Sequence, residues 1–436
     1  MTERRASVVV DLGFGDAGKG TVVDFLVRDR GAHTVVRFNG GGQAGHNVVT
    51  ADGRHHTFSQ LGAGTFVPGV RTHLSRFVVV HPTALMVEAE RIAEAGVPDA
   101  LDRVTIADEA LVTTPHVQAL GRLRELARGD APHGTTGVGV GETMKVMLEQ
   151  PELAVRMRDL FRPAALRRTL ERLREHAAAE AGPMEALDAR ARDEREALLS
   201  SEVIERWLEA VAPLLGRSSL VVGPEHLEGM LARPGEIVLE GAQGVLLDEW
   251  RGFHPHTTWS TCTTENALAL LEGFDGAVER IGVLRSYQTR HGAGPFPTER
   301  EDLRRIDEPH NADLGWQGRF RRGWLDLPLT RYALDCSPVD GLALTHLDRV
   351  EPGWRACVGY EDLAVPLVPA ADPHDLDHVE ALGEALRDVT PILEPTPPDL
   401  AGWVSSALGV EVVLTSRGPT AKDKRWRHER DRFRDG

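Results

Sequence analysis

The chain has 436 residues, of which 41% are hydrophobic, so it can bury a sizeable core as one large domain or two. Its 50 basic and 66 acidic side chains give a net charge of −16 at pH 7. This balance argues against nucleic acid as a partner, because duplex binding needs a basic face. No apolar run approaches the roughly 18 residues of a membrane span, and the three cysteines stand apart from one another. We therefore expect a cytoplasmic protein with no signal peptide, membrane partner, disulfide framework or zinc site.

The stretch from Val8 to Leu26 is typical of a strand, a glycine loop and a helix in succession. An apolar β-branched run precedes GFGDAGKG, and apolar residues at helical spacing follow it. This order aims backbone N–H groups and a helix N-terminus at a phosphate, and Lys19 adds a charge suited to a terminal phosphate. Gly20 stands where a Walker loop has a magnesium-binding Ser or Thr, and Asp16 lies inside the loop. Because an ordinary tight turn needs neither Asp16 nor Lys19, we interpret the stretch as a phosphate-binding loop.

A second stretch, from Val35 to Val49, repeats the design, because a short strand runs into three glycines and then into QAGHN. Further along, an apolar run at 77–82 precedes a helical pattern over 83–95, and a strand pattern covers 102–106. Strands that alternate with helices over residues 1 to about 125 favour an α/β fold. We expect a large, mostly parallel central sheet with helices on both faces.

Residues 151–235 are rich in helix-forming and charged residues, and the charges alternate in sign along helical faces. Because this pattern is typical of a solvated exterior, we predict a helical subdomain that covers the sheet. It lies within a single domain of residues 1–436, since no repeat or low-complexity linker marks a boundary. The charged segment 420–436 is expected to be a frayed helix or disordered.

The two glycine loops resemble the GDEGKGK and GGxNAGH hallmarks of the adenylosuccinate synthetase family. Further segments resemble motifs of that family in the same order: GTTG at 134–137, EGAQG at 240–244, TRHGAGPFPTE at 289–299, RFRRGWLD at 319–326, LTHLD at 344–348 and SRGP at 416–419. The resemblance implies a homodimeric ligase that uses GTP and Mg²⁺. Its reaction would join L-aspartate to C6 of a 6-oxopurine nucleotide, IMP or an IMP-like molecule, through a 6-phosphoryl intermediate.

The resemblance also implies a role for each matching residue. The catalytic residues would be Asp16 as the base that takes the N1 proton, His46 as the acid, Lys19 and Gln243. GTP would contact Gly15, Gly18, Lys19, Gly20, Gly45, His46, Asn47, His346, Asp348, Ser416 and Gly418, with Asp348 as the guanine reader. The acceptor nucleotide would contact Asp16, Gln43, Thr135, Thr136, Gln243, Thr258 and His291. Aspartate would be held by Thr298, Gln317, Arg319 and Arg321, and Mg²⁺ by the Asp16 carboxylate and the Gly45 carbonyl.

Departures from the family pattern cluster where the acceptor and the donor would bind. Val138 replaces Arg, Trp259 replaces Ser, His291 replaces Val, and Trp316 and Gln317 replace two threonines. These changes motivate the hypothesis that the preferred acceptor is related to IMP but is not IMP. A C-nucleoside or 2-aminopurine nucleotide of a specialised pathway, such as nucleoside antibiotic biosynthesis, would fit.

Three interpretations therefore remain open: ordinary adenylosuccinate synthesis, the same chemistry on another acceptor, and a non-catalytic nucleotide-binding paralogue. The presence of four residues argues against the paralogue: Asp16, Lys19, His46 and Gln243. Arg290 is expected to be well placed for a phosphate. A metal site at His254 and His256 has little support, because a histidine pair without a partner motif is weak evidence.

Overall fold

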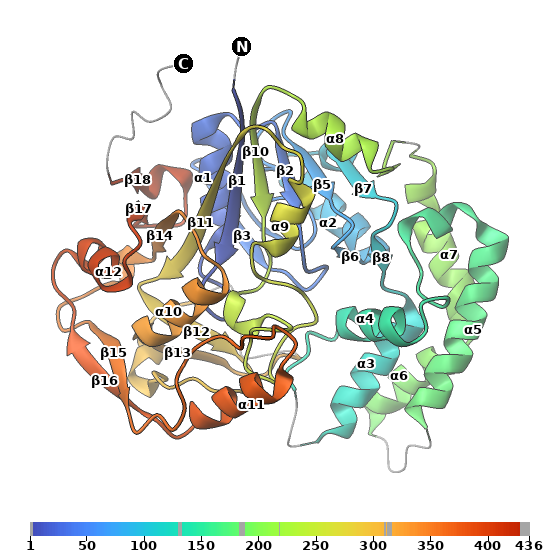
Figure 1. Cartoon of the computed structure of the whole chain (residues 1–436). Coiled ribbons are helices and arrows are strands. Elements are labelled where there is room, and N and C mark those ends of the chain that lie inside the picture. The colour runs from blue at the N-terminus through green and yellow to red at the C-terminus, as the bar shows by residue number, and fades with distance from the viewer. Residues whose placement is uncertain are drawn as a thin grey trace.

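A ten-stranded sheet runs through the centre of the computed structural model, which describes residues 3–129, 133–182, 188–217, 219–308, 311 and 316–427 (Figure 1). Its strands pair in parallel except at one edge, where β17 and β18 are antiparallel. This sheet confirms the expected fold class. In spatial order the strands are β18 (Lys424–Trp426), β17 (Val412–Ser416), β14 (Gly341–Thr345), β11 (Ala277–Arg285), β1 (Arg4–Asp11), β10 (Gly235–Glu240), β2 (Thr34–Arg37), β5 (Arg71–Leu74), β7 (Val104–Ala107) and β9 (Val221–Val222).

Smaller sheets and the helices surround the central sheet. A second sheet is formed by β12 (Tyr287–His291), β13 (Phe320–Asp326), β15 (Arg355–Glu361) and β16 (Thr390–Pro395), and two ribbons by β3 (His46–Val49) with β4 (His55–Phe58) and β6 (Val79–Val80) with β8 (Leu111–Val112). The α-helices are α1 (Lys19–Arg30), α2 (Pro82–Glu94), α3 (Pro115–Ala127), α4 (Val140–Glu149), α5 (Pro163–Ala181), α6 (Ala189–Leu199), α7 (Glu202–Leu215), α8 (Glu225–Leu231), α9 (Glu265–Leu270), α10 (Leu327–Cys336), α11 (Leu376–Ala385) and α12 (Leu400–Leu408). Short 3₁₀ turns are η1 (Ala100–Arg103), η2 (Met157–Phe161), η3 (Val245–Leu247), η4 (Glu301–Arg305), η5 (Leu347–Arg349) and η6 (Ala421–Asp423). Within the described ranges, none of the helices is both long enough and apolar enough to span a bilayer.

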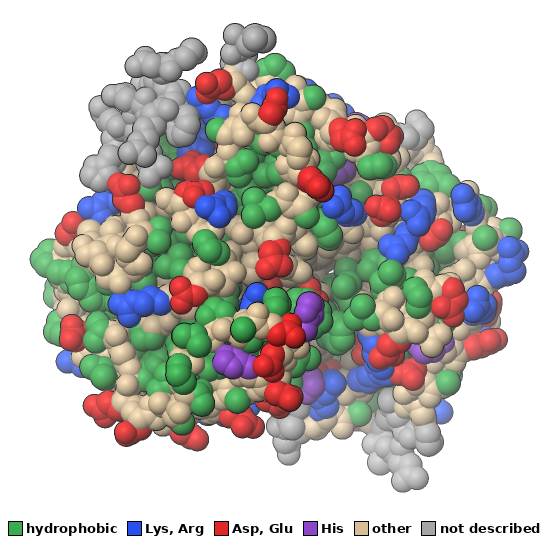
Figure 2. All heavy atoms as spheres, viewed as in Figure 1, with side chains coloured by type: hydrophobic (Ala, Val, Ile, Leu, Met, Phe, Trp, Pro, Cys, Tyr) green, Lys and Arg blue, Asp and Glu red, His purple; other side chains and the backbone are tan. Residues whose placement is uncertain are grey.

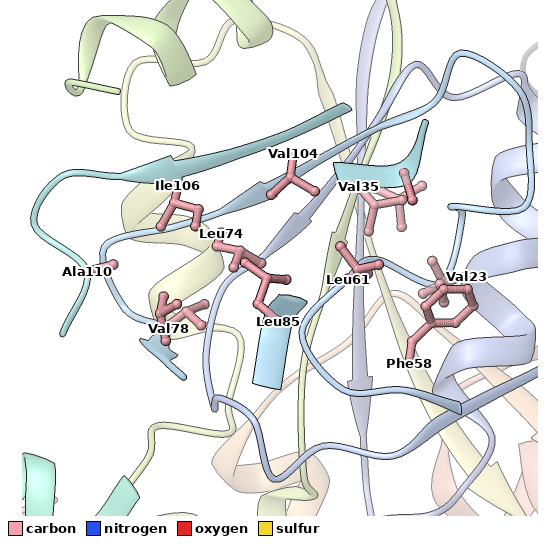
Figure 3. Close-up of a cluster of buried hydrophobic side chains, with 14 of the residues drawn as sticks. Val23, Val35, Phe58, Leu61, Leu74, Val78, Leu85, Val104, Ile106 and Ala110 are labelled. Carbon is pink, nitrogen blue, oxygen red and sulfur yellow. The ribbon is translucent and has the colours of Figure 1, made fainter. Parts of the chain in front are cut away.

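The hydrophobic core lies on both faces of the central sheet. Along β1, Val9 belongs to one cluster of buried side chains, whereas Val8 and Val10 belong to the other. Figure 3 shows part of the first cluster, in which Leu74 of β5 lies beside Leu85 of α2. A strand buried on both faces needs a continuous apolar run. The central position of β1 in the sheet therefore explains the β-branched run before the first glycine loop.

The helical region differs in extent from the predicted subdomain 151–235. It begins earlier, at α3, which packs against α4, α5 and α6 and lies beside the sheet in Figure 1. It also ends earlier, because β9 and α8 return to the central sheet. Leu120 and Leu123 of α3 share a small core with Ala177 and Leu198, so the region has apolar contacts of its own.

The expectation of a frayed or disordered segment at 420–436 is wrong for residues 420–427, and residues 428–436 lie outside the described part of the chain. Lys424 is buried and its Nζ donates to the carbonyls of Gly418 and Thr420 at 3.0 and 2.9 Å. The Trp426 ring packs against Phe25, with 5.6 Å between ring centroids. Charge content alone predicted mobility, but these buried contacts hold the segment against α1.

Candidate active site

A cavity of about 1270 Å³ opens where the carboxyl ends of the central strands meet the second sheet and the helical region. Figure 2 shows a hollow on this face of the molecule, between the main body and the helical region. Ligands of doubly wound sheets bind at the carboxyl ends of the strands. The predicted residues on the cavity wall are Gly15, Asp16, Gly18, Lys19, Gly20, Gln43, Gly45, His46, Asn47, Thr135, Thr136, Gln243, Thr258, His291, Gln317, His346, Asp348, Ser416 and Gly418.

Asp11, the last residue of β1, organises the first glycine loop. Its carboxylate accepts hydrogen bonds from the backbone N–H groups of Gly13 and Ala17 at 2.8 and 2.9 Å, and forms an ion pair with Lys19 at 2.9 Å. Both members of the pair are almost completely buried. The ammonium of Lys19 is thus held at the cavity wall by a counter-ion behind it. Such a buried pair is costly to break from one side, because the remaining charge has no partner.

Asp16 occupies a strained position inside the same loop. Its φ is +59°, a left-handed conformation that Asp and Asn adopt more readily than most residues. Its carboxylate lies 3.2 Å from Nε2 of His291, and its carbonyl accepts a hydrogen bond from Arg285 at 3.0 Å. Burial raises the pKa of Asp16, but the His291 contact and the nearby charges of Lys19 and Arg285 outweigh it and hold the pKa below its usual value. Asp16 is therefore ionised in the free enzyme, which is the form that can accept a proton.

His46, the first residue of β3, is paired with Glu240, the last residue of β10. The distance from His46 Nδ1 to Glu240 Oε1 is 2.5 Å, and Oε2 accepts the N–H of Ala63 at 2.9 Å. Burial raises the pKa of Glu240, but the hydrogen bonds from His46 and Ala63 and the charge of Arg37 bring this pKa below its usual value. Since a carboxylate only accepts, Nδ1 of His46 carries the proton, and Nε2 is left for a ligand.

Burial lowers the pKa of His46, and the charges of Arg37 and Lys19 lower it further, whereas Glu240 raises it. The net direction is downward, so the free enzyme holds a neutral imidazole with a buried carboxylate beside it. A buried carboxylate in this position orients a catalytic histidine and stabilises the protonated ring that forms during the reaction. Gly20 lets the two loops meet, because a Cβ there would lie 2.8 Å from Cβ of His46.

Two glutamines on the cavity wall have buried polar atoms without hydrogen-bond partners among the described residues. They are both amide atoms of Gln43 and Oε1 of Gln243. Gln243 also has a positive φ of 56°, so its loop is held in an uncommon conformation. Buried amides are normally satisfied, and unpartnered ones on a cavity wall indicate a polar ligand.

At the third glycine loop, the carboxylate of Glu125 in α3 accepts the N–H groups of Gly134 and Thr135 at 2.7 and 3.2 Å. This contact presents Thr135 and Thr136 on the wall. Elsewhere on the wall, a Cβ on Gly18 would lie 3.5 Å from the ring of His346. Predicted GTP-binding and acceptor-binding residues thus line one cavity.

The residues predicted to hold aspartate do not all reach this cavity. Gln317 does, whereas Thr298, Arg319 and Arg321 are absent from its described wall. The hydroxyl of Thr298 donates to the backbone of β13. Arg321 and Arg319 both pair with Glu299, at 2.7 and 3.1 Å. A carboxylate of the protein itself therefore occupies the two guanidinium groups.

Arg290 lies on the wall of the cavity and also holds the loop that follows it. Its buried guanidinium donates to the carbonyls of Ala293, Pro295 and His256 at 2.9, 3.1 and 3.1 Å, and lies 4.2 Å from the ring centroid of Phe14. Burial, together with neighbouring arginines, lowers the pKa of Arg290 to about 9. The side chain therefore shapes the rigid loop, and the expectation that it also serves a phosphate stays a prediction.

Two of the departures from the family pattern have structural partners. Trp316 lies against Gly137, where an added Cβ would be 2.6 Å from the indole, and under the guanidinium of Arg190 at 3.6 Å. Trp259 lines the cavity beside Gly141 of α4. The first substitution ties the 316–318 loop to the helical region, and the second changes the wall near Thr258.

Sequence reasoning missed Asp11, Glu240 and Arg285 as parts of the site. Each stands at the last position of a central strand, at the edge where the glycine loops begin. A charged residue that ends an otherwise buried strand was the available signal. Because the carboxyl ends of parallel strands meet at one edge of the sheet, these three positions together indicate one site near the loops.

Loops at this edge of a doubly wound sheet are suited to nucleotides, and a proton acceptor, a lysine and an oriented histidine supply chemistry beside them. The fold and the cavity therefore define a nucleotide-dependent enzyme. A profile of the adenylosuccinate synthetase family matches residues 8–414. The chain belongs to this family.

Individual relatives agree with that assignment. The chain is 31% identical over 423 residues to the adenylosuccinate synthetase of Neisseria gonorrhoeae strain NCCP11945, and the alignment covers 94% of this chain and 90% of that protein. Its fold is similar to that of fully ligated adenylosuccinate synthetase from Plasmodium falciparum, with a TM-score of 0.77, 20% identity and coverage of 97% and 99% of the two chains. A cyanophage S-2L succinoaminodeoxyadenylate synthetase, PurZ, bound to dGMP and to dATP as an energy donor, shares the fold with a TM-score of 0.57, 18% identity and coverage of 97% and 95%.

Membership makes the chain a ligase that forms a carbon–nitrogen bond and uses GTP to join aspartate to IMP or an IMP-like nucleotide. This confirms the activity that the motifs predicted. The comparisons favour neither a non-catalytic paralogue nor a non-standard acceptor.

Proposed function

We propose that this chain joins L-aspartate to C6 of IMP in two chemical steps, with Asp16 as the base and His46 as the acid. The observation that supports these roles best is the convergence of Asp16, Lys19 and the His46–Glu240 pair on one cavity. An oxo group leaves poorly, so O6 must first become a phosphate ester. Asp16 takes the N1 proton, O6 attacks the γ-phosphorus of GTP, and GDP leaves. The amine of aspartate then attacks C6, inorganic phosphate leaves, and the amine loses a proton.

Lys19 and the loop amides would hold the γ-phosphate, where charge accumulates as the phosphoryl group transfers. His46 would take a proton from solvent at Nε2 as the anionic substrates bind. The protonated ring would then stabilise the charge on O6 and on the transferred group, with Glu240 holding the ring in place. Gln43 and Gln243 offer amide groups for the purine base or the phosphate. These roles and a homodimeric assembly remain predictions from the resemblance, and a cytoplasmic location remains a prediction from the sequence composition.

The donor set of the cavity fits Mg²⁺. The ion is usually held by one or two carboxylates together with substrate phosphates, and the Asp16 carboxylate and the Gly45 residue both lie on the wall. Among the described residues, no group of three or more His, Cys, Asp or Glu side chains forms a dedicated metal site. Asp16 and the Gly45 carbonyl would therefore hold Mg²⁺ together with GTP, and the ion would neutralise charge on the phosphates.

The acceptor is tested by comparing kcat/KM for IMP with the values for analogues altered in the base or at the glycosidic bond. IMP should be best by about tenfold or more, which corresponds to roughly 1.4 kcal/mol of transition-state discrimination. Phosphate release with aspartate and GTP is the readout. A preference for a C-nucleoside or 2-aminopurine nucleotide would instead show that Trp259 and His291 have changed the acceptor. No turnover with any acceptor would contradict the proposed ligase activity.

Arg319→Leu should raise the KM for aspartate at least about tenfold, because a charge-assisted hydrogen bond typically contributes about 1.5–3 kcal/mol. The KM values for GTP and IMP should stay within about twofold, since Arg319 lies outside the nucleotide cavity. Arg322→Leu is the matched control. Arg321 of β13 pairs with Glu299, and side chains alternate between the two faces of a strand, so the next residue, Arg322, points away from Glu299. An unchanged KM for aspartate in Arg319→Leu would place the donor elsewhere, with Gln317 as the remaining predicted contact.

A further inference from the structure

A second pocket lies beside α8, toward the β9 edge of the central sheet. It has a volume of about 560 Å³ and is lined by α8 and by residues before and after it. Arg71 is the first residue of β5, and Arg233 lies two residues before β10 begins. Both therefore stand at the amino ends of parallel strands, whereas the catalytic loops follow the carboxyl ends. The two cavities share none of their wall residues.

The wall of this second pocket carries positive charge that the described part of the protein does not neutralise. Arg71 is half-buried, its Nε is inaccessible to solvent, and its guanidinium makes no hydrogen bond or ion pair within the described ranges. Arg233, which is exposed, has no ion pair with a described residue either. Glu225 is the one carboxylate on the described wall, and its side chain folds back toward Gly223.

A histidine completes the polar side of the pocket. His226 of α8 has a buried Nε2 without a hydrogen-bond partner among the described residues, and its ring lies 6.3 Å from that of His73. Burial and the neighbouring His226 lower the pKa of His73 to about 4, so His73 stays neutral at physiological pH. Val221, Val222 and Met230 add apolar surface to the same wall.

We propose that this second pocket binds a small phosphate-bearing anion between the guanidinium groups of Arg71 and Arg233. Guanidinium groups match phosphate oxygens through two parallel N–H donors. A buried donor without an acceptor is costly, and an anion would supply the missing acceptors for Arg71 and His226. The apolar surface would accept the non-polar part of such a molecule. The proposal does not depend on the reaction at the first cavity.

Inorganic pyrophosphate is a suitable probe, and its binding to the full chain can be followed by calorimetry. Saturating GDP and IMP in the cell would occupy the catalytic cavity. Arg71→Gln and Arg233→Gln should each weaken pyrophosphate binding at least about tenfold, as expected for the loss of a charge-assisted contact. Arg71→Lys should retain part of the affinity, because the charge remains. Arg91→Gln, at an exposed position of α2, is the matched control and should bind as the parent does.

Each outcome of this experiment decides the proposal. Because Arg233 is exposed, Arg233→Gln should fold normally and tests the site even if Arg71→Gln is unstable. Thermal unfolding of every variant separates lost binding from lost structure. Binding that stays within about twofold in both glutamine variants, or no binding to the parent protein up to about 10 mM pyrophosphate, would overturn the proposal.

Discussion

Asp16→Asn should abolish turnover while leaving the fold and nucleotide binding in place. An amide cannot take the N1 proton, and loss of a positioned base usually costs about 10²–10⁴-fold in rate. Asparagine is the appropriate replacement, because it tolerates the positive φ of this position. It also keeps the backbone carbonyl that accepts from Arg285. Steady-state phosphate release gives kcat, and equilibrium binding of GTP and IMP shows whether the cavity is intact.

The matched control for this variant is Asp362→Asn. Asp362 also has a positive φ, of 56°, but it is exposed and absent from the described wall of the cavity. Its replacement should leave kcat unchanged, which would show that an Asp-to-Asn change at a positive φ does not by itself lower the rate. A rate within about tenfold of the parent for Asp16→Asn would remove Asp16 from the role of base.

The general fold could be predicted from the sequence because the central strands carry the signal locally. Val8, Val9 and Val10 form a continuous apolar run that only a strand buried on both faces requires. The glycine loops follow such runs directly, which fixed the order of strand, loop and helix. Motif order then placed residues from distant parts of the chain on one cavity.

The pairings within the site could not be predicted in the same way. His46 and Glu240 are 194 positions apart, and their contact depends on the strand order of the finished sheet. Likewise, nothing local indicates that Arg290 bonds to three carbonyls, or that Glu299 occupies Arg321. An arginine in a glycine-rich loop is equally suited to a phosphate and to backbone carbonyls, and only the packed structure decides.

Composition was misleading at the C-terminus for a physical reason. A segment rich in charge is usually solvated, but Lys424 finds backbone carbonyls in the interior and Trp426 finds an aromatic partner in α1. The long side chain of lysine can bury its stem while its ammonium remains satisfied. The residue types therefore predicted an exposed segment, whereas in the folded protein Lys424 is buried and Trp426 packs against Phe25.

His46→Asn should lower kcat by about 10²–10⁴-fold, the usual contribution of a positioned acid. Glu240→Gln should cost about 10²-fold or more, although Glu240 touches no substrate, because it positions His46. The N–H of Ala63 needs the remaining amide oxygen, so the NH₂ group of the new glutamine would face Nδ1 of His46. That nitrogen could then no longer carry the proton, and no carboxylate would remain to stabilise the protonated ring.

A double-mutant cycle tests whether the two residues act as one unit. If Glu240 works through His46, the double variant should be little slower than His46→Asn alone, because effects within a unit are not additive. Glu88→Gln is the control for a buried glutamate that holds backbone N–H groups, here those of Ser59 and Gln60 at 2.7 and 2.8 Å. It should lower the midpoint of thermal unfolding with little change in kcat. Fully additive losses in the double variant would show that Glu240 supports the fold and leaves the chemistry of His46 alone.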